Sequence, residues 1–379
     1  MKVGILTHPV HDNYGGALQA FALYTVLERN GYDPILLQRE FHSEQTFSLI
    51  KRIKFEIVRL LNLLGIYKNT KRLTSSQLAI VCKNFSTFLA KRIPNRTPWL
   101  HSTRALKKSC HEYGIEAIIV GSDQVWRPCY TPHIYNYYLD FCQDMVNMKR
   151  ISYAASFGVD YWEYDSKMTE RCRNLIKYFD KVSVREESGV SLCKNYLGRN
   201  DAVWVADPTL LLGMDDYKKL MSSDSFLQKK KNLFCYLLDD NEKKQEFIHK
   251  VNNQGKYNVV SIDTKVFPKT TMNDEELKSM AYPKIEEWLR NFYDSSFIVT
   301  DSFHGTVFSI IFNKPFVVFA NTKRGNSRIV SLLSRLGLEG RLVSDNNSMC
   351  LDTHIDWQDV NRRLEVWKKE SLDYLLSSL

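Results

Sequence analysis

The residues best suited to chemistry follow two neighbouring apolar runs in the second half of the sequence. The run 297–300 leads into the segment DSFHG, which holds Ser302 and His304, and a helix is predicted directly after it. The run 316–319 leads into a basic segment with four further polar side chains, Lys323, Arg324, Ser327 and Arg328. Helix N-termini attract anions, and an arginine can hold a carboxylate or a phosphate with two hydrogen bonds. A lone histidine is more often a core residue, so it is the clustering with the arginines that favours an anion site that includes His304.

A polar group of another kind follows the apolar run 117–120. The segment GSDQVW presents Ser122, Asp123 and Gln124 directly after the predicted strand, and then Trp126. Hydroxyl, carboxylate and amide groups suit the recognition of sugar hydroxyls. Trp126 has two interpretations, because a tryptophan can stack on a sugar face or pack in the core.

A third candidate loop lies near the start of the chain. Asn13, Tyr14, Gly15 and Gly16 stand between a predicted strand, 2–7, and a predicted helix that runs from about residue 17 to residue 29. Paired glycines let a ligand approach the backbone closely, and they are equally compatible with a simple tight turn. The spacing does not match G-x-G-x-x-G, so a dinucleotide site is not supported.

Arg185 is the last polar candidate, at the end of the apolar run 182–185. It could bind an acidic ligand, or it could form a structural ion pair with Glu186 or Asp207.

The recurring unit along the chain is a short apolar run followed by an amphipathic helix. This order is typical of α/β layers with parallel sheets, in which ligands bind beyond the carboxyl ends of the strands. All the loops above occupy such positions, so we expect them to face one cleft. Further strands are predicted at 35–38, 151–155, 203–206, 234–238 and 259–262, and further helices at 329–336 and 357–376.

The stretch 215–231 is rich in Asp, Ser and Lys and is the expected domain joint. This division gives an N-terminal Rossmann-like domain at 1–213 and a second one at 214–350. The remaining segment, 351–379, is expected to pack back on the first domain as a helix.

Length and composition limit the class of protein. The 379 residues suffice for two domains, and 44% hydrophobic with 25% charged residues is typical of globular chains. The formal charge of +9 favours anionic partners. Eight scattered cysteines without a C-x-x-C pair favour reduced thiols over a disulfide framework or a zinc site. The sequence shows neither a signal peptide nor an apolar run of membrane-spanning length, so a cytoplasmic location is expected.

Residues 47–67 combine an apolar helical stripe with a basic face, whose charges come from Lys51, Arg52, Lys54 and Arg59. Such a segment most often packs on its own domain with the basic side in solvent. It is also suited to lie on an anionic membrane surface, which would place the protein at the inner face of the membrane.

Five segments together resemble the polysaccharide pyruvyl transferase family, namely 13–20, 120–126, 182–186, 207–212 and 302–305. They occur in the family's order over most of the chain, and the ordered set is more specific than any one segment. The resemblance implies an α/β fold of two Rossmann-like domains facing across a cleft, as in GT-B enzymes. It also implies phosphoenolpyruvate as donor and a hexose, such as galactose, of a capsular or exopolysaccharide precursor as acceptor. The product would be a pyruvate ketal on a sugar that is carried as a lipid-linked oligosaccharide.

The site residues then divide between the two domains. His304 as general acid and Asp123 as base or hydroxyl ligand form the expected catalytic pair. The donor side comprises Ser302, Lys323, Arg324, Ser327 and Arg328. The acceptor side and cleft comprise Asn13, Tyr14, Gly15, Gly16, Gln19, Ser122, Gln124, Trp126 and Arg185. Several family members have an arginine two residues before the histidine, where this sequence has Ser302. Arg324 and Arg328 could supply that charge, and neither a metal nor a cofactor is expected.

Two other classes of protein remain open at this point. A GT-B glycosyltransferase that uses a nucleotide sugar would have the same fold, and its diphosphate would also suit the basic segment. A non-catalytic protein that binds sugar or nucleic acid is the second alternative. The sequence has no helix-turn-helix, RNA-recognition or zinc motif, so nucleic acid is not an expected partner.

Overall fold

The computed structural model describes residues 1–40, 75–221, 231–262, 272–321, 324–343 and 354–379. Residues 47–67, for which a membrane contact was considered, and Lys323 lie outside these described residues. Within them, no helix combines the length and the apolar character needed to cross a bilayer.

The first half of the chain forms a parallel sheet of four strands in the order β2-β1-β3-β4. Its strands and helices are β1 (Lys2–Leu6), α1 (Tyr14–Arg29), β2 (Asp33–Leu36), α3 (Ser75–Val81), α4 (Lys83–Arg92), α5 (Thr103–Tyr113), β3 (Ala117–Val120), β4 (Lys149–Ser152) and α6 (Ser166–Ile176). In the central strand pair Leu6 lies opposite Val120, so the loops after β1 and β3 leave the sheet side by side. Both strands are rich in Val, Ile and Leu because both faces of the sheet are covered.

A two-stranded parallel sheet extends this half. It consists of β5 (Ser183–Val184) and β6 (Val203–Trp204), and single bridges such as Ala155 to Val184 connect it to the end of β4. The short helices that accompany it are α7 (Glu187–Leu192), α8 (Pro208–Leu211) and α9 (Met214–Lys218).

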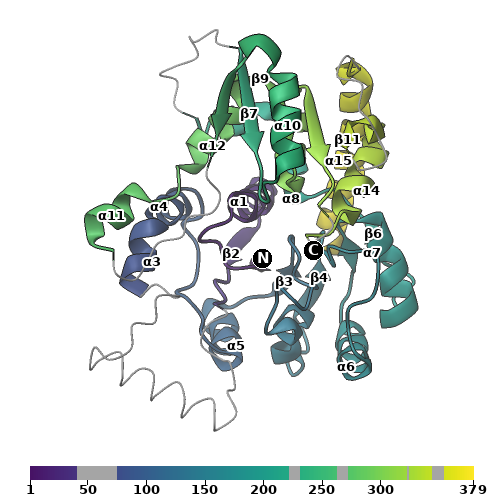
Figure 1. The fold of residues 1–379 in the computed structure, drawn as a ribbon. Coiled ribbons are helices and arrows are strands. Elements are labelled where there is room, and N and C mark those ends of the chain that lie inside the picture. Colours follow the sequence, from purple (N-terminus) through teal and green to yellow (C-terminus); the bar gives the residue numbers. More distant parts are fainter. Residues whose placement is uncertain (41–74, 222–230, 263–271, 322–323, 344–353) are drawn as a thin grey trace.

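The second half forms a parallel sheet of five strands in the order β11-β10-β9-β7-β8. Its elements are β7 (Asn232–Tyr236), α10 (Glu242–Val251), β8 (Asn258–Ser261), α11 (Asp274–Ser279), α12 (Ile285–Asp294), β9 (Ser295–Thr300), α13 (Phe303–Ile311), β10 (Phe316–Phe319), α14 (Ser327–Leu336) and β11 (Leu342–Val343). Figure 1 shows this sheet in green above the elements of the first half. With both sheets parallel and covered by helices, the predicted α/β class with two Rossmann-like sheets is confirmed.

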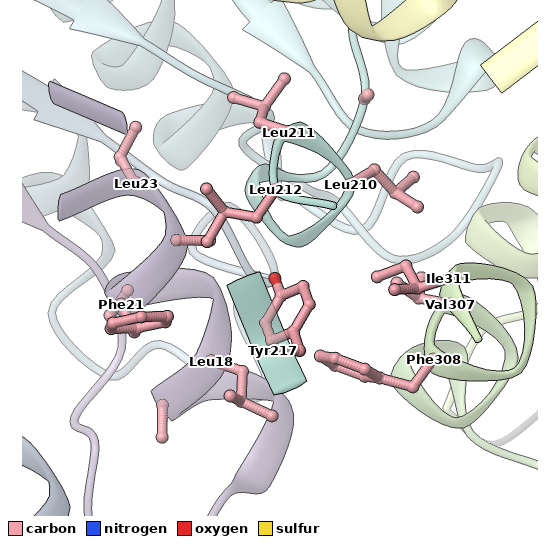
Figure 2. Packing of buried hydrophobic residues seen from close by; sticks show 14 of the residues in the cluster. Leu18, Phe21, Leu23, Leu210, Leu211, Leu212, Tyr217, Val307, Phe308 and Ile311 are labelled. Atoms are coloured by element: carbon pink, nitrogen blue, oxygen red, sulfur yellow. The ribbon is translucent and has the colours of Figure 1, made fainter. Parts of the chain in front are cut away.

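The two sheets share one hydrophobic core. Figure 2 shows Leu18 and Phe21 of α1 and Phe308 of α13 converging on Tyr217 of α9. The rings of Tyr217 and Phe308 pack edge to face with their centroids 4.9 Å apart, and the Tyr217 hydroxyl donates to the carbonyl of Thr209. Large buried aromatic side chains therefore fix α1 of the first half against α13 of the second.

The C-terminal helix α15 (Trp357–Ser378) contacts both halves. The Ala206 backbone N–H donates to Ser371 Oγ at 2.9 Å, and the Trp204 and Trp367 rings pack with centroids 5.3 Å apart. On its other side α15 lies against α14, where Arg335 pairs with Glu370. In Figure 1 it runs beside α14 and β11 towards β6.

Candidate active site

A cavity of about 270 Å³ lies where the carboxyl ends of the strands of the two sheets meet. The first half contributes residues from the loops after β1 and β3, and the second half contributes residues from the loops after β9 and β10. The predicted site residues on its wall are Asn13, Tyr14, Gly15, Asp123, Gln124, Ser302, His304, Arg324 and Arg328. The two sheets thus bring these loops to one place, as expected for ligand sites at strand ends.

His304 lies in the first turn of α13 and is only 7% exposed. Ser302 is the N-cap of this helix, and its hydroxyl accepts a hydrogen bond from the Gly305 N–H. The imidazole Nε2 lies 3.9 Å from Asp207 Oδ1 and has no hydrogen-bond partner in the described part of the chain. Burial lowers the pKa of His304 to about 4. The negative charge of Asp207 opposes this shift, and the positive charge of Arg185 adds a smaller lowering. Without an anionic ligand the imidazole is therefore neutral at neutral pH.

The position of His304 depends on a glycine in α1. A Cβ atom on Gly15 would lie 1.9 Å from His304 Nδ1. Gly15 is in the first turn of α1, which begins at Tyr14 after the N-cap Asn13, so the helix starts three residues before the predicted Ala17. The paired glycines are thus helical, and neither makes the tight turn considered from the sequence. The role of Gly15 is to let α1 approach the histidine of α13.

Asp123 has an unusual backbone conformation, with φ at 74°. This left-handed region is sparsely populated by residues other than glycine, and its use at a cavity wall is typical of functional positions. Asp123 Oδ1 accepts from the Gln124 N–H at 2.8 Å and from Arg185 Nη2 at 3.4 Å, and Oδ2 accepts from Asn13 Nδ2 at 3.4 Å. Burial opposes ionisation, but the nearby His8, Arg185 and His304 hold the pKa of Asp123 below its usual range. The carboxylate is therefore charged.

Arg185 lies behind the cavity wall and forms the buried ion pair that was one of its two interpretations. Its guanidinium donates to Asp207 Oδ2 at 3.0 Å and reaches Asp123, and it is 2% exposed. The same Asp207 oxygen accepts from the Ser122 hydroxyl at 2.8 Å. Glu186, the other expected partner, accepts instead from the backbone N–H groups of Phe157 and Gly158. Arg185 is thus neutralised by two carboxylates.

Arg328 is the exception among the arginines of this region. Arg324 binds Asp239 through Nε at 2.6 Å, whereas Arg328, which is 8% exposed, forms no ion pair in the part of the chain that the structure describes. Its Nη2 donates to the Arg324 carbonyl at 3.0 Å, and its Nε has no partner among the described residues. Burial, together with the charge of Arg185, lowers the pKa of Arg328 to about 10, so it stays charged at neutral pH. A buried cation without a carboxylate is costly unless a ligand neutralises it.

Three predicted site residues lie in the core and not on the cavity wall, namely Trp126, Gln19 and Ser122. Trp126 is fully buried, its Nε1 donates to the Tyr137 carbonyl at 3.0 Å and its ring stacks on Tyr138, so it cannot stack on a ligand. Gln19 is fully buried as well, where it donates to Thr7 Oγ1 and accepts from the Ser122 N–H. Gln19 and Ser122 therefore hold the loop after β3 in place from behind.

Two further predicted site residues, Gly16 and Ser327, also lie outside the cavity wall. Gly16 lies in the first turn of α1, next to the side chain of its N-cap Asn13. Ser327 lines a separate groove of about 610 Å³ between α7 and α14.

Several residues on the cavity wall were not among the predicted site residues, namely Asp12, Tyr236, Leu238, Tyr282, Asp301 and Asn321. Asp301 comes one residue after β9 and Asn321 two residues after β10, so their position after a strand could have identified them as site residues. The Asp301 carboxylate accepts from the Leu238 and Asp239 N–H groups and pairs with Lys244, so it organises the loop after β7. Tyr282 lies far from any predicted strand end, and the sequence offers no comparable signal for it.

Comparisons with solved structures support the fold. A UDP-N-acetylglucosamine 2-epimerase from Rickettsia bellii aligns with a TM-score of 0.51 and 11% identity over 100% of this chain and 96% of that one. The UDP-GlcNAc 2-epimerase from Methanocaldococcus jannaschii gives 0.51 and 13% over 97% and 93%, and the S. aureus MnaA-UDP structure gives 0.50 and 14% over 98% and 91%. At such identities the likeness shows the fold alone, and it confirms the GT-B-like arrangement.

Comparison of sequences identifies the family. No curated protein matches this sequence. The model of one family, described as polysaccharide pyruvyl transferase, matches residues 13–323, and this range includes the loops that form the cavity. The chain therefore belongs to the polysaccharide pyruvyl transferase family.

Proposed function

We propose that this transferase moves pyruvate from phosphoenolpyruvate to two hydroxyls of a hexose, such as galactose, in a capsular or exopolysaccharide precursor. The observation that carries the proposal is the buried Arg328, which has no carboxylate partner among the described residues and lies on the same cavity wall as His304. A dianion in the cavity would neutralise the arginine and lie next to the histidine.

The size and composition of the cavity favour a small donor. Its volume of about 270 Å³ is below the range of roughly 300–1,000 Å³ that is usual for pockets holding drug-sized ligands. Phosphoenolpyruvate carries a carboxylate and a phosphate on three carbons. Arg328 and the N-terminus of α13 both border the cavity and suit such anionic groups.

In the proposed reaction the bound dianion raises the pKa of His304, which becomes protonated. A sugar hydroxyl oxygen attacks C2 of the donor while His304 delivers its proton to C3 and turns the methylene into a methyl group. Asp123 accepts a hydrogen bond from the attacking hydroxyl and takes its proton as the new C–O bond forms. A second hydroxyl of the same sugar then bonds to C2 and its proton leaves with the released phosphate, which completes the ketal. No step in this scheme draws on a redox change or a cofactor.

The test is release of inorganic phosphate from phosphoenolpyruvate across a panel of lipid-linked oligosaccharides, with wild type and His304→Ala. The variant should stay folded, because the side chain borders a cavity, and kcat should fall by about two to four orders of magnitude, the range for general acid catalysis. His249→Ala, which removes an exposed histidine of α10, is the matched control and should behave as wild type. A His304→Ala enzyme with the wild-type kcat would remove this histidine from the mechanism.

We further propose that the acceptor is lipid-linked and that the basic residues of 47–67 bring the enzyme to an anionic membrane surface. Each cation near such a surface contributes about 1 kcal/mol, so replacing Lys51, Arg52, Lys54 and Arg59 by Glu should abolish flotation with anionic liposomes. Equal flotation of both proteins would contradict the membrane contact and leave the transfer reaction untouched.

A further inference from the structure

A second cavity, of about 290 Å³, borders the first one. The two cavities have five residues in common, namely Asp12, Asn13, Asp123, Gln124 and Arg324. The second cavity extends away from His304 and Arg328 and is completed by residues of the loops after β1 and β3, among them His8, His11 and Tyr130. Asp123 therefore lines both cavities.

The two cavities differ in charge. The first contains Arg328, which forms no ion pair with a described residue, and Asp301, which is paired with Lys244. The second contains His8 and His11 instead, and it shares the carboxylates of Asp12 and Asp123 with the first. Asp12 is exposed and forms no ion pair with any described residue, and the guanidinium of Arg324 is bound to Asp239. An anion such as phosphoenolpyruvate would meet like charge here. A neutral molecule rich in hydroxyl groups would instead find acceptors in the carboxylates and further partners in the imidazole and amide groups.

Tyr130 gives the second cavity a flat apolar surface. Its side chain is 37% exposed, and the guanidinium of Arg127 lies 5.0 Å from its ring centroid. Arg127 is itself fixed by Glu163 at 3.2 Å and by the Arg324 carbonyl at 2.9 Å. A buried, hydrogen-bonded arginine therefore contacts the ring, while part of the ring stays exposed to solvent. An aromatic ring next to convergent polar groups is the usual composition of a sugar-binding pocket.

We propose that this second cavity is the acceptor subsite, in which a neutral pyranose packs its C–H face on Tyr130 and points one hydroxyl at Asp123. The inference rests on the proposed pyruvyl transfer, because it assigns the donor to the cavity of Arg328 and the acceptor to its neighbour. Asp123 then stands between the two substrates, where it can receive the hydroxyl that attacks the donor. Asp12 binds a hydroxyl next to the attacking one.

The groove between α7 and α14 is the competing location. It is larger, about 610 Å³, and exposes an aromatic side chain of its own, Tyr161 at 58%. It meets the donor cavity at Gly325 and includes neither Asp123 nor His304, so a sugar bound there would be remote from the reacting groups. Tyr161 therefore provides a matched control for Tyr130.

The experiment combines saturation-transfer NMR with steady-state kinetics on wild type, Tyr130→Ala, Tyr130→Phe and Tyr161→Ala. The NMR probes are the methyl glycosides of glucose, galactose, mannose and N-acetylglucosamine. At least one glycoside should receive saturation from wild type, from Tyr130→Phe and from Tyr161→Ala, and lose it with Tyr130→Ala. In the phosphate-release assay Tyr130→Ala should raise the acceptor KM about tenfold, equivalent to about 1.4 kcal/mol, and leave the affinity for phosphoenolpyruvate unchanged.

The outcomes separate this subsite from the reaction. If phosphoenolpyruvate is turned over and Tyr130→Ala keeps the wild-type acceptor KM, or if only Tyr161→Ala raises it, the subsite is wrong and the transfer stands. If glycosides bind in a Tyr130-dependent way but no acceptor releases phosphate, the subsite stands and the transfer is wrong. Absence of saturation transfer from wild type to all four glycosides overturns the subsite.

Discussion

At the scale of single residues, the site is defined by which charges remain without a partner. Three arginines near the cavity are neutralised, since Arg127 binds Glu163, Arg185 binds Asp207 and Arg324 binds Asp239. Arg328 has no such partner among the described residues and lies within the field of Arg185. Its buried charge is the reason for proposing that an anion binds in this cavity.

The depressed pKa of His304 predicts a pH dependence of stability. Its folded pKa of about 4 lies below the ordinary value of 6.5, so the unfolded chain binds a proton that the folded chain does not as the pH falls. Stability should therefore be lost between about pH 6.5 and pH 4, by up to about 3 kcal/mol, because one pKa unit corresponds to about 1.4 kcal/mol. Urea unfolding of wild type and His304→Gln across this range isolates the effect as the difference between the two curves.

Two results of that titration can be told apart. The difference should grow as the pH falls and should shrink when phosphoenolpyruvate is present, because a bound dianion favours the protonated imidazole. Parallel curves for the two proteins from pH 7 to pH 4 would show that His304 is not buried in a neutral form.

Much of the cavity wall could be predicted because its residues follow strand ends. Asn13, Asp123, His304 and Arg328 all satisfy this rule, which the parallel sheets turn into proximity. The rule does not tell which side chain of a loop faces the ligand, and Trp126 turns into the core behind Asp123. The sequence also does not show which arginine forms an ion pair, because the partner carboxylates are distant from the arginines in the sequence.

At the scale of elements, most strands occur where their apolar runs predicted them, and β3 and β10 match to the residue. The starts of α1, α13 and α14 were predicted too late, whereas α15 begins at Trp357 as predicted. α1 begins at Tyr14 and α13 at Phe303, each directly after a side chain that accepts from a backbone N–H, Asn13 and Ser302. Both N-caps are visible in the sequence, but the glycines that follow them suggested a loop. β11 was missed because two half-buried residues form no apolar run.

The close approach of α1 to α13 predicts that Gly15→Ala impairs catalysis. The added methyl group would overlap the His304 ring, so the ring must turn away from its position beside Asp207. We expect kcat to fall at least tenfold in the phosphate-release assay, with a smaller change in melting temperature than a core cavity would cause. Gly213→Ala is the control, because a Cβ there meets open space. Wild-type kcat in Gly15→Ala would mean that His304 tolerates displacement and is not held for catalysis.

At the scale of the whole molecule, two parallel sheets share a core and leave their strand ends facing one cavity. Buried side chains of α1, α9 and α13 pack against one another and hold the two halves together (Figure 2). The helix α15 contacts both the chain after β6 and α14. The groups proposed to bind the donor and the acceptor hydroxyl therefore come from different halves, Arg328 and His304 from the second and Asp123 from the first. This division would suit the proposed transfer between two substrates.

The most direct test of this account is isothermal titration calorimetry with phosphoenolpyruvate. Wild type should bind it, and Arg328→Met should bind at least about tenfold more weakly, since hydrogen bonds to a charged group contribute about 1.5–3 kcal/mol. Arg335→Met, on the same helix and far less buried, should bind as wild type does. If wild type gives no heat with phosphoenolpyruvate but binds UDP-N-acetylglucosamine saturably, the cavity is not a pyruvyl-donor site and the proposed reaction is contradicted.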